Sequence, residues 1–334
     1  MTRWLRWMLS LVPRREAAGP RLVVVRHHRI YPDGARPLYR VGVSESVFGA
    51  QLDLLVRVGL APLTVEDGLA WLRGARGGLR VAMSFDDGYA DNVRVGLPLL
   101  ERHRARATFY LTAGLMEERV APWWDRLAHR VERAGVTTLD WMLEGRHLHA
   151  PLGDERSRRA AMVALLPAFR AVPEVQQRRL HELAERLRSQ GEPPCELATW
   201  DEARALVASA MEVGAHTLSH PHLSRLSPER QEAEIAGSID RIENRLGTRP
   251  RGMAYPGGDY DAASVAACAN HGLRYAVTTR RGDVHPGSAP FELPRRALSD
   301  GACLDPFGRF SERMTRAEIA GAFDHLRRAA EVAS

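Results

Sequence analysis

The sequence predicts an α/β fold in which a parallel sheet is joined by helical crossovers. Two observations support this prediction: short apolar runs of strand length alternate with amphipathic helical stretches, and two of these runs end abruptly in polar side chains. With 334 residues, of which 45% are hydrophobic and 26% charged, the chain can bury the core of one barrel-sized domain or of two smaller ones.

The first part of the pattern is expected between residues 21 and 111. The apolar run at 81–85 is too short for a helix and is bounded by glycines, so it is predicted to be a buried strand. Ser44 and Thr64 are predicted helix caps, because their hydroxyl groups can accept hydrogen bonds from a first helical turn. The expected elements are strands at 22–25, 81–85 and 107–111, and helices at 45–58, after Thr64, and at 92–103.

Residues from about 115 to 200 interrupt this alternation. They contain amphipathic stretches rich in arginine and glutamate, at 129–134, 156–169 and 175–189. We therefore predict a helical insertion that packs beside the sheet. The adjacent Trp123 and Trp124 are open to two interpretations, since they can belong to the core or stack on the apolar face of a sugar ring.

The alternation resumes after residue 200. Strands are expected at 212–215, 252–255 and 275–279, and helices at 202–208, 227–246 and 262–270. A last helix is expected to begin at a capping box formed by Thr315 and Glu318. The predicted divisions are a tail or short amphipathic helix at 1–20, the main domain with its insertion at 21–310, and a C-terminal helix at 311–334.

Composition excludes some classes of function. The net charge is +6 with a pI near 9.7, but no basic run is interleaved with aromatic residues, so nucleic acid is not an expected partner. The number of cysteines is odd and their spacing is not that of a metal site, which predicts a reducing compartment and hence the cytoplasm; they are Cys195, Cys268 and Cys303.

Residues 1–15 carry tryptophan, leucine and arginine side chains. Their apolar part is short, is interrupted by Arg6 and has no small-residue cleavage site, so no signal peptide is predicted. Two interpretations stay open: the segment is a docking helix or frayed end, or it contacts an anionic membrane peripherally. No stretch of the sequence is long enough to span a bilayer.

Two carboxylates, Asp86 and Asp87, directly follow the predicted strand 81–85. In α/β folds the carboxyl ends of parallel strands carry the chemistry. Successive residues that leave a strand point in opposite directions, so the two aspartates need not share a role. The alternative is a simple turn, because Asp-Gly is a strong hairpin signal.

Two histidines follow the predicted strand 212–215 in the same way. His216 and His220 are four residues apart, a spacing that can hold one cation. Such a pair is weak evidence in a chain with 13 histidines, but the two strand ends together are much stronger. His222 lies outside this pattern and is predicted to be a surface histidine.

In these residues the chain resembles the polysaccharide deacetylases. The family's Thr/Ser-Phe-Asp-Asp-Gly motif is matched at 84–88, its His-Ser/Thr-x-x-His-Pro motif at 216–221 and its Ala-Tyr-Pro-x-Gly motif at 254–258. The resemblance covers about 21–298 apart from the insertion, and it implies a distorted (β/α) barrel of about seven strands.

The resemblance implies that Asp87, His216 and His220 bind a divalent metal and that Asp86 is the general base. This mixed set of nitrogen and oxygen ligands suits zinc, with cobalt, nickel or iron as alternatives.

The general acid and the partner of the base are implied by a permuted branch of the family. A strand in that branch ends in Tyr-His-x-Val, and this aligns His28 with the histidine that acts as the general acid. The alternatives are that His27 is the acid, or that the role of His28 is only structural. A Leu-Pro-Arg segment of the same branch matches Arg295, which would then orient Asp86, although a surface arginine fits equally well.

The third motif departs from the family pattern, with Ala254 where arginine is common and Gly257 in place of an aromatic residue. A backbone N–H group can still bind an oxyanion, so Tyr255 and Gly257 are the candidates for substrate and oxyanion contacts.

The implied function is metal-dependent removal of N-acetyl, or other acyl, groups from a saccharide, polysaccharide or lipid-linked sugar. Two alternatives stay open: hydrolysis of a small cyclic amide, and glycan binding without catalysis. Open aromatic subsites would favour a sugar, whereas a narrow closed pocket would favour the cyclic amide. The oligomeric state does not follow from the sequence.

Overall fold

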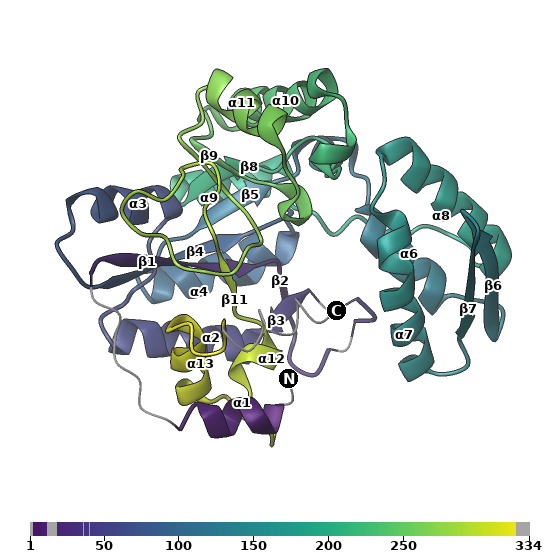
Figure 1. Cartoon of the computed structure of the whole chain (residues 1–334), viewed down its shortest axis with the longest axis horizontal. Helices are drawn as coiled ribbons and strands as arrows, with labels where there is room; N and C mark the ends of the chain where they lie inside the picture. The colour runs from purple at the N-terminus through teal and green to yellow at the C-terminus, as the bar shows by residue number, and fades with distance from the viewer. Residues whose placement is uncertain (1–2, 12–18, 36, 40, 325–334) are drawn as a thin grey trace.

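A computed structural model of the chain describes residues 3–11, 19–35, 37–39 and 41–324. Its centre is a seven-stranded sheet in which every neighbouring pair is parallel, in the order β10-β9-β8-β5-β4-β1-β11 (Figure 1). The strands are β1 (Arg21–His27), β4 (Leu79–Phe85), β5 (Thr108–Leu111), β8 (Glu212–Ala215), β9 (Gly252–Ala254), β10 (Tyr275–Val277) and β11 (Arg296–Ala297). The predicted α/β fold, a distorted barrel of about seven strands, is confirmed.

Helices connect these strands and bury apolar side chains against the sheet. Phe48, Leu52 and Leu55 of α2 lie in the main core with the strand residues, as their spacing predicts. Thr64 caps α3, because its side chain accepts a hydrogen bond from the Asp67 N–H. These helices are α2 (Glu45–Arg57), α3 (Val65–Gly74), α4 (Leu97–Arg102), α9 (Trp200–Ala208), α10 (Pro228–Leu246) and α11 (Ala262–Asn270).

The predicted start of the last helix is wrong. Helix α13 (Glu312–Ile319) begins after Ser311, whose side chain accepts a hydrogen bond from the Met314 N–H. Thr315 therefore lies inside the helix, where its hydroxyl donates to the Ser311 carbonyl instead of capping. Residues 325–334 of the predicted C-terminal helix lie outside the described residues.

The insertion is more than the helical segment that the sequence suggests. Its helices are α5 (Ala113–Glu118), α6 (Trp123–Glu132), α7 (Glu155–Leu165) and α8 (Pro173–Leu187). An antiparallel hairpin of β6 (Thr138–Leu143) and β7 (Arg146–Pro151) lies between α6 and α7. The hairpin turn uses Glu144 and Gly145, both with positive φ. Alternate residues of β6 point inward, and this short period-two pattern was the signal that the prediction missed.

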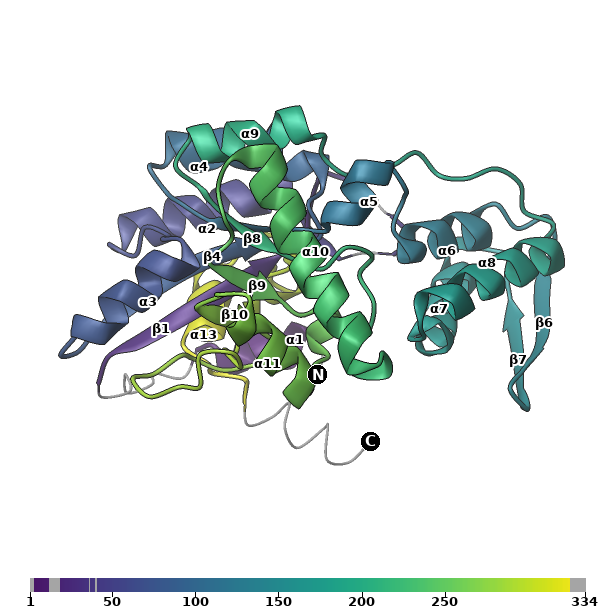
Figure 2. The ribbon, with the colours of Figure 1, turned by 90° about the horizontal axis from the view of Figure 1, so that it is seen from above.

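Trp141 and Phe169 lie at the centre of a second hydrophobic core, which the insertion builds from its own helices and hairpin. Figure 2 shows that α6, α7, α8 and the hairpin form a body to one side of the sheet. Tyr39 and Leu38, from the segment between β2 (Arg29–Tyr31) and β3 (Gly42–Ser44), pack against this core. The insertion therefore contacts the barrel on the side where these segments emerge.

Tyr89 ties the insertion to the segment after β4. Its hydroxyl donates to Asp125 Oδ2 (2.9 Å) and accepts from Trp124 Nε1 (2.7 Å). Burial raises the pKa of the Asp125 carboxyl to about 7 from its ordinary 3.8.

Asp125→Asn is expected to stabilise the protein near and above neutral pH. Between pH 3.8 and about 7, Asp125 is protonated in the folded state but has lost its proton in the unfolded state. The free energy of unfolding of the wild type therefore falls as pH rises through that window. In urea unfolding, the free energy of unfolding of the variant minus that of the wild type should be larger at about pH 8 than at about pH 5, by more than about 1 kcal/mol. An advantage that does not grow with pH contradicts the assignment.

Among the described residues, no helix combines the length and apolar character needed to cross a bilayer.

Candidate active site

The candidate site lies where the carboxyl ends of β4, β5 and β8 meet. Asp86 and Asp87 directly follow β4, and His216 directly follows β8, with β5 between the two strands in the sheet. Because all three strands are parallel, these side chains reach the same edge of the sheet from segments far apart in the sequence.

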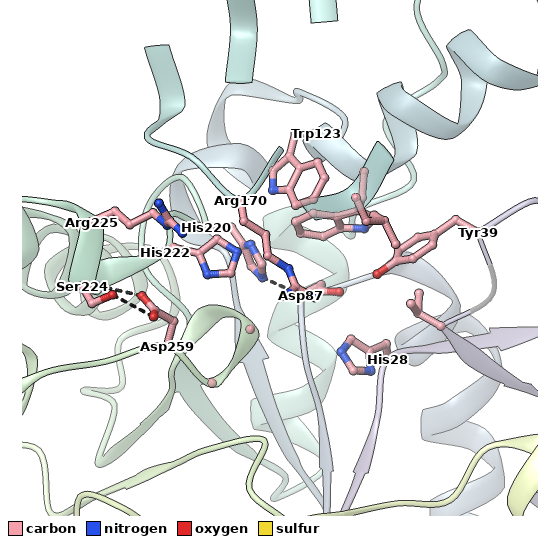
Figure 3. Close-up of a pocket in the computed structure, with 15 residues that line it drawn as sticks. His28, Tyr39, Asp87, Trp123, Arg170, His220, His222, Ser224, Arg225 and Asp259 are labelled. Atoms are coloured by element: carbon pink, nitrogen blue, oxygen red, sulfur yellow. Dashed lines mark hydrogen bonds and ion pairs between the residues drawn. The ribbon is translucent and has the colours of Figure 1, made fainter. Parts of the chain in front are cut away.

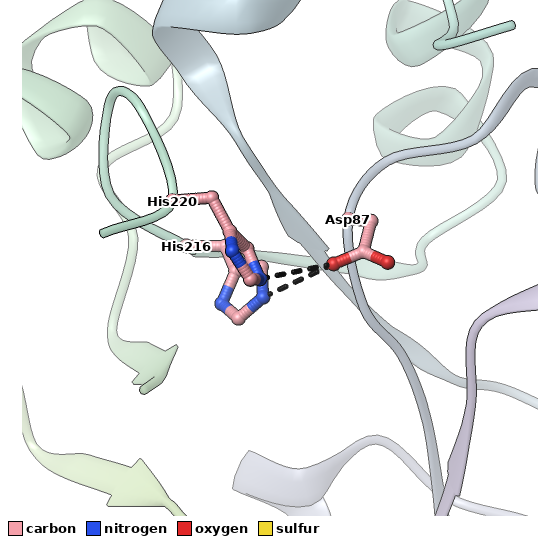
Figure 4. A group of neighbouring side chains, drawn as sticks. All are labelled: Asp87, His216 and His220. Carbon is pink, nitrogen blue, oxygen red and sulfur yellow. Dashed lines mark ion pairs between the residues drawn. The ribbon is translucent and has the colours of Figure 1, made fainter. Parts of the chain in front are cut away.

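Asp87, His216 and His220 converge on one point. Asp87 Oδ1 lies 3.3 Å from His216 Nε2 and 3.5 Å from His220 Nε2 (Figure 4). One ligand atom from each residue lies within 4.8 Å of the other two. Asp87 and His216 are buried and His220 is nearly so; Asp87 and His220 also line a cavity, so a group of three potential metal ligands lies at its wall.

The backbone at this point adopts conformations that non-glycine residues rarely take. Asp87, Thr217 and His220 have φ values of 76°, 63° and 58°. The loop is held in place because the Thr217 hydroxyl accepts the His220 N–H, and Glu234 accepts the N–H groups of the two residues between them. Strain of this kind collects at functional sites, where the surroundings determine the geometry.

The three side chains fit a divalent cation. His216 Nδ1 lies 2.6 Å from the Ala254 carbonyl oxygen, so the hydrogen on Nδ1 donates to that oxygen and Nε2 presents its lone pair to Asp87. In tetrahedral zinc sites with bonds of about 2.0–2.1 Å, ligand atoms lie about 3.3 Å apart, close to the separations found here. Without a cation, the Nε2 atoms of His216 and His220 would both lie against the same oxygen, Oδ1 of Asp87.

Asp86 is held by Arg295 in a bidentate ion pair. Arg295 donates from its two terminal nitrogens to Asp86 Oδ1 and Oδ2, over 2.6 and 2.7 Å, and from Nε to the Thr278 carbonyl. Burial alone would raise the pKa of Asp86, but the adjacent guanidinium holds it well below its usual range. Arg295 is 2% exposed, so the alternative of a surface arginine is wrong.

The two candidate acids, His27 and His28, occupy different environments. His28 lines the cavity, and its Nε2 lies 3.9 Å from Asp86 Oδ2. His27 is 3% exposed and packs between Phe48 and Phe85, with burial lowering its pKa to about 3. Only His28 of this pair faces the site.

The third motif brings Gly257 to the cavity but not Tyr255. The Tyr255 side chain is fully buried, its ring stacks on Tyr260, and its backbone N–H donates to the Val277 carbonyl. The prediction that Tyr255 contacts substrate or oxyanion is therefore not supported by its position. Gly257 lines the cavity with φ 61°, and a Cβ there would lie 3.0 Å from His222 Cε1.

The site opens into a cavity of about 490 Å³ (Figure 3). Trp123 and Trp124 both line it, although Trp124 is 4% exposed and its ring lies against His220. His222 is half-buried and faces the cavity, so the prediction of a surface histidine is wrong.

Sequence reasoning missed other lining residues. Tyr39 comes from the segment before α2, and Arg170 comes from the insertion. No local pattern marks either residue, because each reaches the cavity through the packing of the insertion on the barrel.

Comparison with known proteins identifies the family. Residues 73–141 and 174–276, together just over half of the chain, match the family model for polysaccharide deacetylase. YxkH of Bacillus subtilis (strain 168), whose name places it among the polysaccharide deacetylases, is 26% identical over 116 residues. That match spans 35% of this chain and 42% of YxkH.

Two solved structures show the same fold. The deacetylase PplD of Streptococcus pyogenes, solved in complex with acetate, superposes with a TM-score of 0.58 at 18% identity, over 86% of this chain and 96% of PplD. IcaB from Ammonifex degensii superposes with a TM-score of 0.56 at 21% identity, over 91% of this chain and 98% of IcaB. Taken with the match of the family model, the arrangement of the motif residues leads to one conclusion: the chain belongs to the polysaccharide deacetylase family.

Proposed function

We propose that this protein is a metal-dependent hydrolase that removes N-acetyl, or other acyl, groups from a saccharide, polysaccharide or lipid-linked sugar. The observation that carries this proposal is the meeting of Asp87, His216 and His220 beside the Arg295-bound carboxylate of Asp86. Amide hydrolysis needs a stronger nucleophile than water, stabilisation of the oxyanion, and a proton for the leaving amine. The residues around the cavity can supply each of these.

Asp87, His216 and His220 would hold the divalent cation, with zinc preferred and cobalt, nickel or iron(II) as alternatives. When bound, the cation supplies a Lewis acid that polarises the acyl carbonyl and lowers the pKa of water. His216 is oriented for this role by its hydrogen bond to Ala254.

Asp86 is the proposed general base. Its carboxylate lies beside the metal-binding residues and is ionised at neutral pH, because Arg295 stabilises the negative charge. The bidentate contact also fixes the orientation of the carboxylate beside the metal-binding residues. Arg295 is therefore a positioning residue.

His28 is the proposed general acid for the leaving amine. It lines the cavity beside Asp86, and burial lowers its pKa from the ordinary value. The backbone N–H of Gly257, at the cavity wall, is the proposed second contact for the oxyanion.

His28→Gln is expected to lower kcat by about 10²–10⁴-fold without loss of metal, because the leaving amine then departs without a positioned proton donor. His27→Leu is the matched control, since it replaces the neighbouring ring in an apolar environment with a side chain of similar volume. The measurement is acetate release under saturating substrate, with metal content determined on the same samples. Equal losses in the two variants would indicate a structural effect and contradict the assignment.

The cavity favours a sugar over a small cyclic amide. Its volume of about 490 Å³ and its wall of Trp123, Trp124 and Tyr39 are those of a site for an extended ligand with apolar faces. The alternative of a glycan-binding protein without catalysis is disfavoured by the metal-binding cluster beside a buried carboxylate.

The test is acetate release from N-acetylated chitooligosaccharides, and from lipid-linked N-acetyl sugars, by protein whose metal content has been measured. Release that stops on chelation and returns with zinc supports the proposal. A metal-loaded protein that is inactive on every acylated sugar but hydrolyses cyclic amides would favour the alternative hydrolase.

We also propose a cytoplasmic location, on the basis of three free cysteines. The predicted membrane contact involves residues 1–15, which are separate from the residues that line the cavity.

A further inference from the structure

Helix α1 (Arg3–Leu9) turns its arginine toward the protein and its apolar side chains toward solvent. Its buried residue is Arg6, at 8% exposure, and the following Ser10 is equally buried. By contrast, Trp4, Met8 and Leu11 are 52%, 50% and 45% exposed. A helix that served only to cover the core would bury its apolar side chains and expose its arginine.

The orientation of α1 is fixed by contacts of its arginine. Arg6 donates to the carbonyl oxygens of Gly301 (2.6 Å) and Ala302 (3.1 Å) and to Glu318 Oε2 (3.0 Å). Its guanidinium also lies 5.1 Å from the centre of the Phe323 ring. Rolling the helix to bury its apolar side would break these contacts and leave Glu318, which is fully buried, without this partner.

Phe307 extends the apolar surface beyond the helix. It is 68% exposed, and its ring lies 5.5 Å from that of Trp4. The loop that carries it is held by Asp305, which accepts the N–H groups of Phe307 and Arg309. Trp4, Met8, Leu11 and Phe307 together are called the apolar patch.

Three arginines lie on the segment that adjoins the patch. Arg309, Arg313 and Arg316 are exposed, and no hydrogen bond or ion pair of their side chains is found within the described part of the chain. Arg313 and Arg316 line a shallow surface hollow together with Trp7 of α1. Figure 1 shows α1 at the bottom of the molecule, next to α12 and α13.

The acidic side chains of the same segment are already engaged. Glu312 accepts from Arg57, Glu318 pairs with Arg6 and Arg281, and Asp305 closes its own loop. Asp305 keeps its negative charge, because the groups that it accepts are neutral N–H groups, but the three arginines outnumber it. The surface around the patch therefore has a surplus of positive charge, in a chain whose net charge is +6.

We propose that α1 and the segment 304–316 dock on the surface of an anionic lipid bilayer. Tryptophan, leucine, methionine and phenylalanine side chains would enter the boundary between headgroups and acyl chains, while the three arginines contact anionic headgroups. A second copy of this chain is the weaker candidate, because a symmetric dimer through the patch would bring the arginines of both copies together. The bilayer is complementary in charge and in apolar character.

Co-sedimentation with lipid vesicles tests this proposal. The full chain is expected to bind vesicles of phosphatidylcholine with phosphatidylserine and to bind pure phosphatidylcholine much more weakly, with binding that falls as salt rises. Trp4→Ser with Phe307→Ser should weaken binding by about tenfold or more, through lost apolar burial. Arg309→Gln, Arg313→Gln and Arg316→Gln together should weaken it by about a hundredfold, since each arginine near an anionic surface contributes about a factor of five.

Met142→Ser with Val163→Ser is the matched control, because these side chains are 62% and 67% exposed but lie on the insertion. It should bind as the wild type does. The proposal is overturned if the control variant loses as much vesicle binding as the patch variant, or if the full chain binds neutral and anionic vesicles equally well.

Two further outcomes also overturn it. One is a dimer in solution that Phe307→Ser dissociates, together with no vesicle binding, because the occupant is then a second copy. The other is a large loss of thermal stability in the patch variant, because the patch is then covered by the chain itself. Vesicle binding is measured without substrate, so it stands or falls independently of acetate release.

Discussion

His216→Ala is expected to yield a folded protein that no longer retains a divalent metal and no longer releases acetate. His216 contributes one of three ligand atoms and is positioned by its own hydrogen bond to Ala254. Loss of a partner that merely orients a ligand already costs 10–100-fold in metal affinity, so loss of the ligand should cost at least about a hundredfold. Elemental analysis after dialysis and an acetate assay measure the two effects on the same preparation.

His222→Ala is the matched control for this experiment. His222 is also a histidine at the cavity wall, two residues beyond His220, but it lies outside the group of three that can hold a metal. It should keep its metal. If His216→Ala retains as much metal as His222→Ala, the proposed ligand set is wrong.

Asp86→Asn is expected to retain the metal and to lower kcat by about 10²–10⁴-fold. The amide keeps the shape of the carboxylate and can still accept a hydrogen bond from Arg295, but it cannot take a proton from water. Metal retention follows because Asp86 is not one of the three converging ligands. Steady-state kinetics at saturating substrate, with metal analysis, measures both quantities.

The same substitution should also reduce stability, because Arg295 is left as a buried charge without its carboxylate. Asp91→Asn separates this effect from catalysis. Asp91 likewise binds an arginine, Arg29, but does not line the cavity. A loss of kcat in Asp91→Asn equal to that in Asp86→Asn would trace the effect to lost stability and remove Asp86 as the base.

Much of the sheet and the group of Asp87, His216 and His220 were predictable because their signals are local. A short apolar run flanked by glycines indicates a buried strand, and parallel strands meet at one edge, so polar residues after β4 and β8 were expected to be neighbours. The hairpin of β6 and β7 was missed, since six-residue strands joined by Glu144 and Gly145 give a weak pattern inside an otherwise helical segment.

The sequence alone predicted six of the seven strands of the main sheet and singled out Asp86, Asp87, His216 and His220, because periodicity and motif spacing are read along the chain. Only the tertiary structure decided that Arg295 pairs with Asp86, that His28 rather than His27 faces the cavity, and that Arg6 is buried while Trp4 is exposed. Those outcomes depend on contacts between residues up to 312 positions apart, as between Arg6 and Glu318, and no local pattern encodes which distant side chain a charged group will meet.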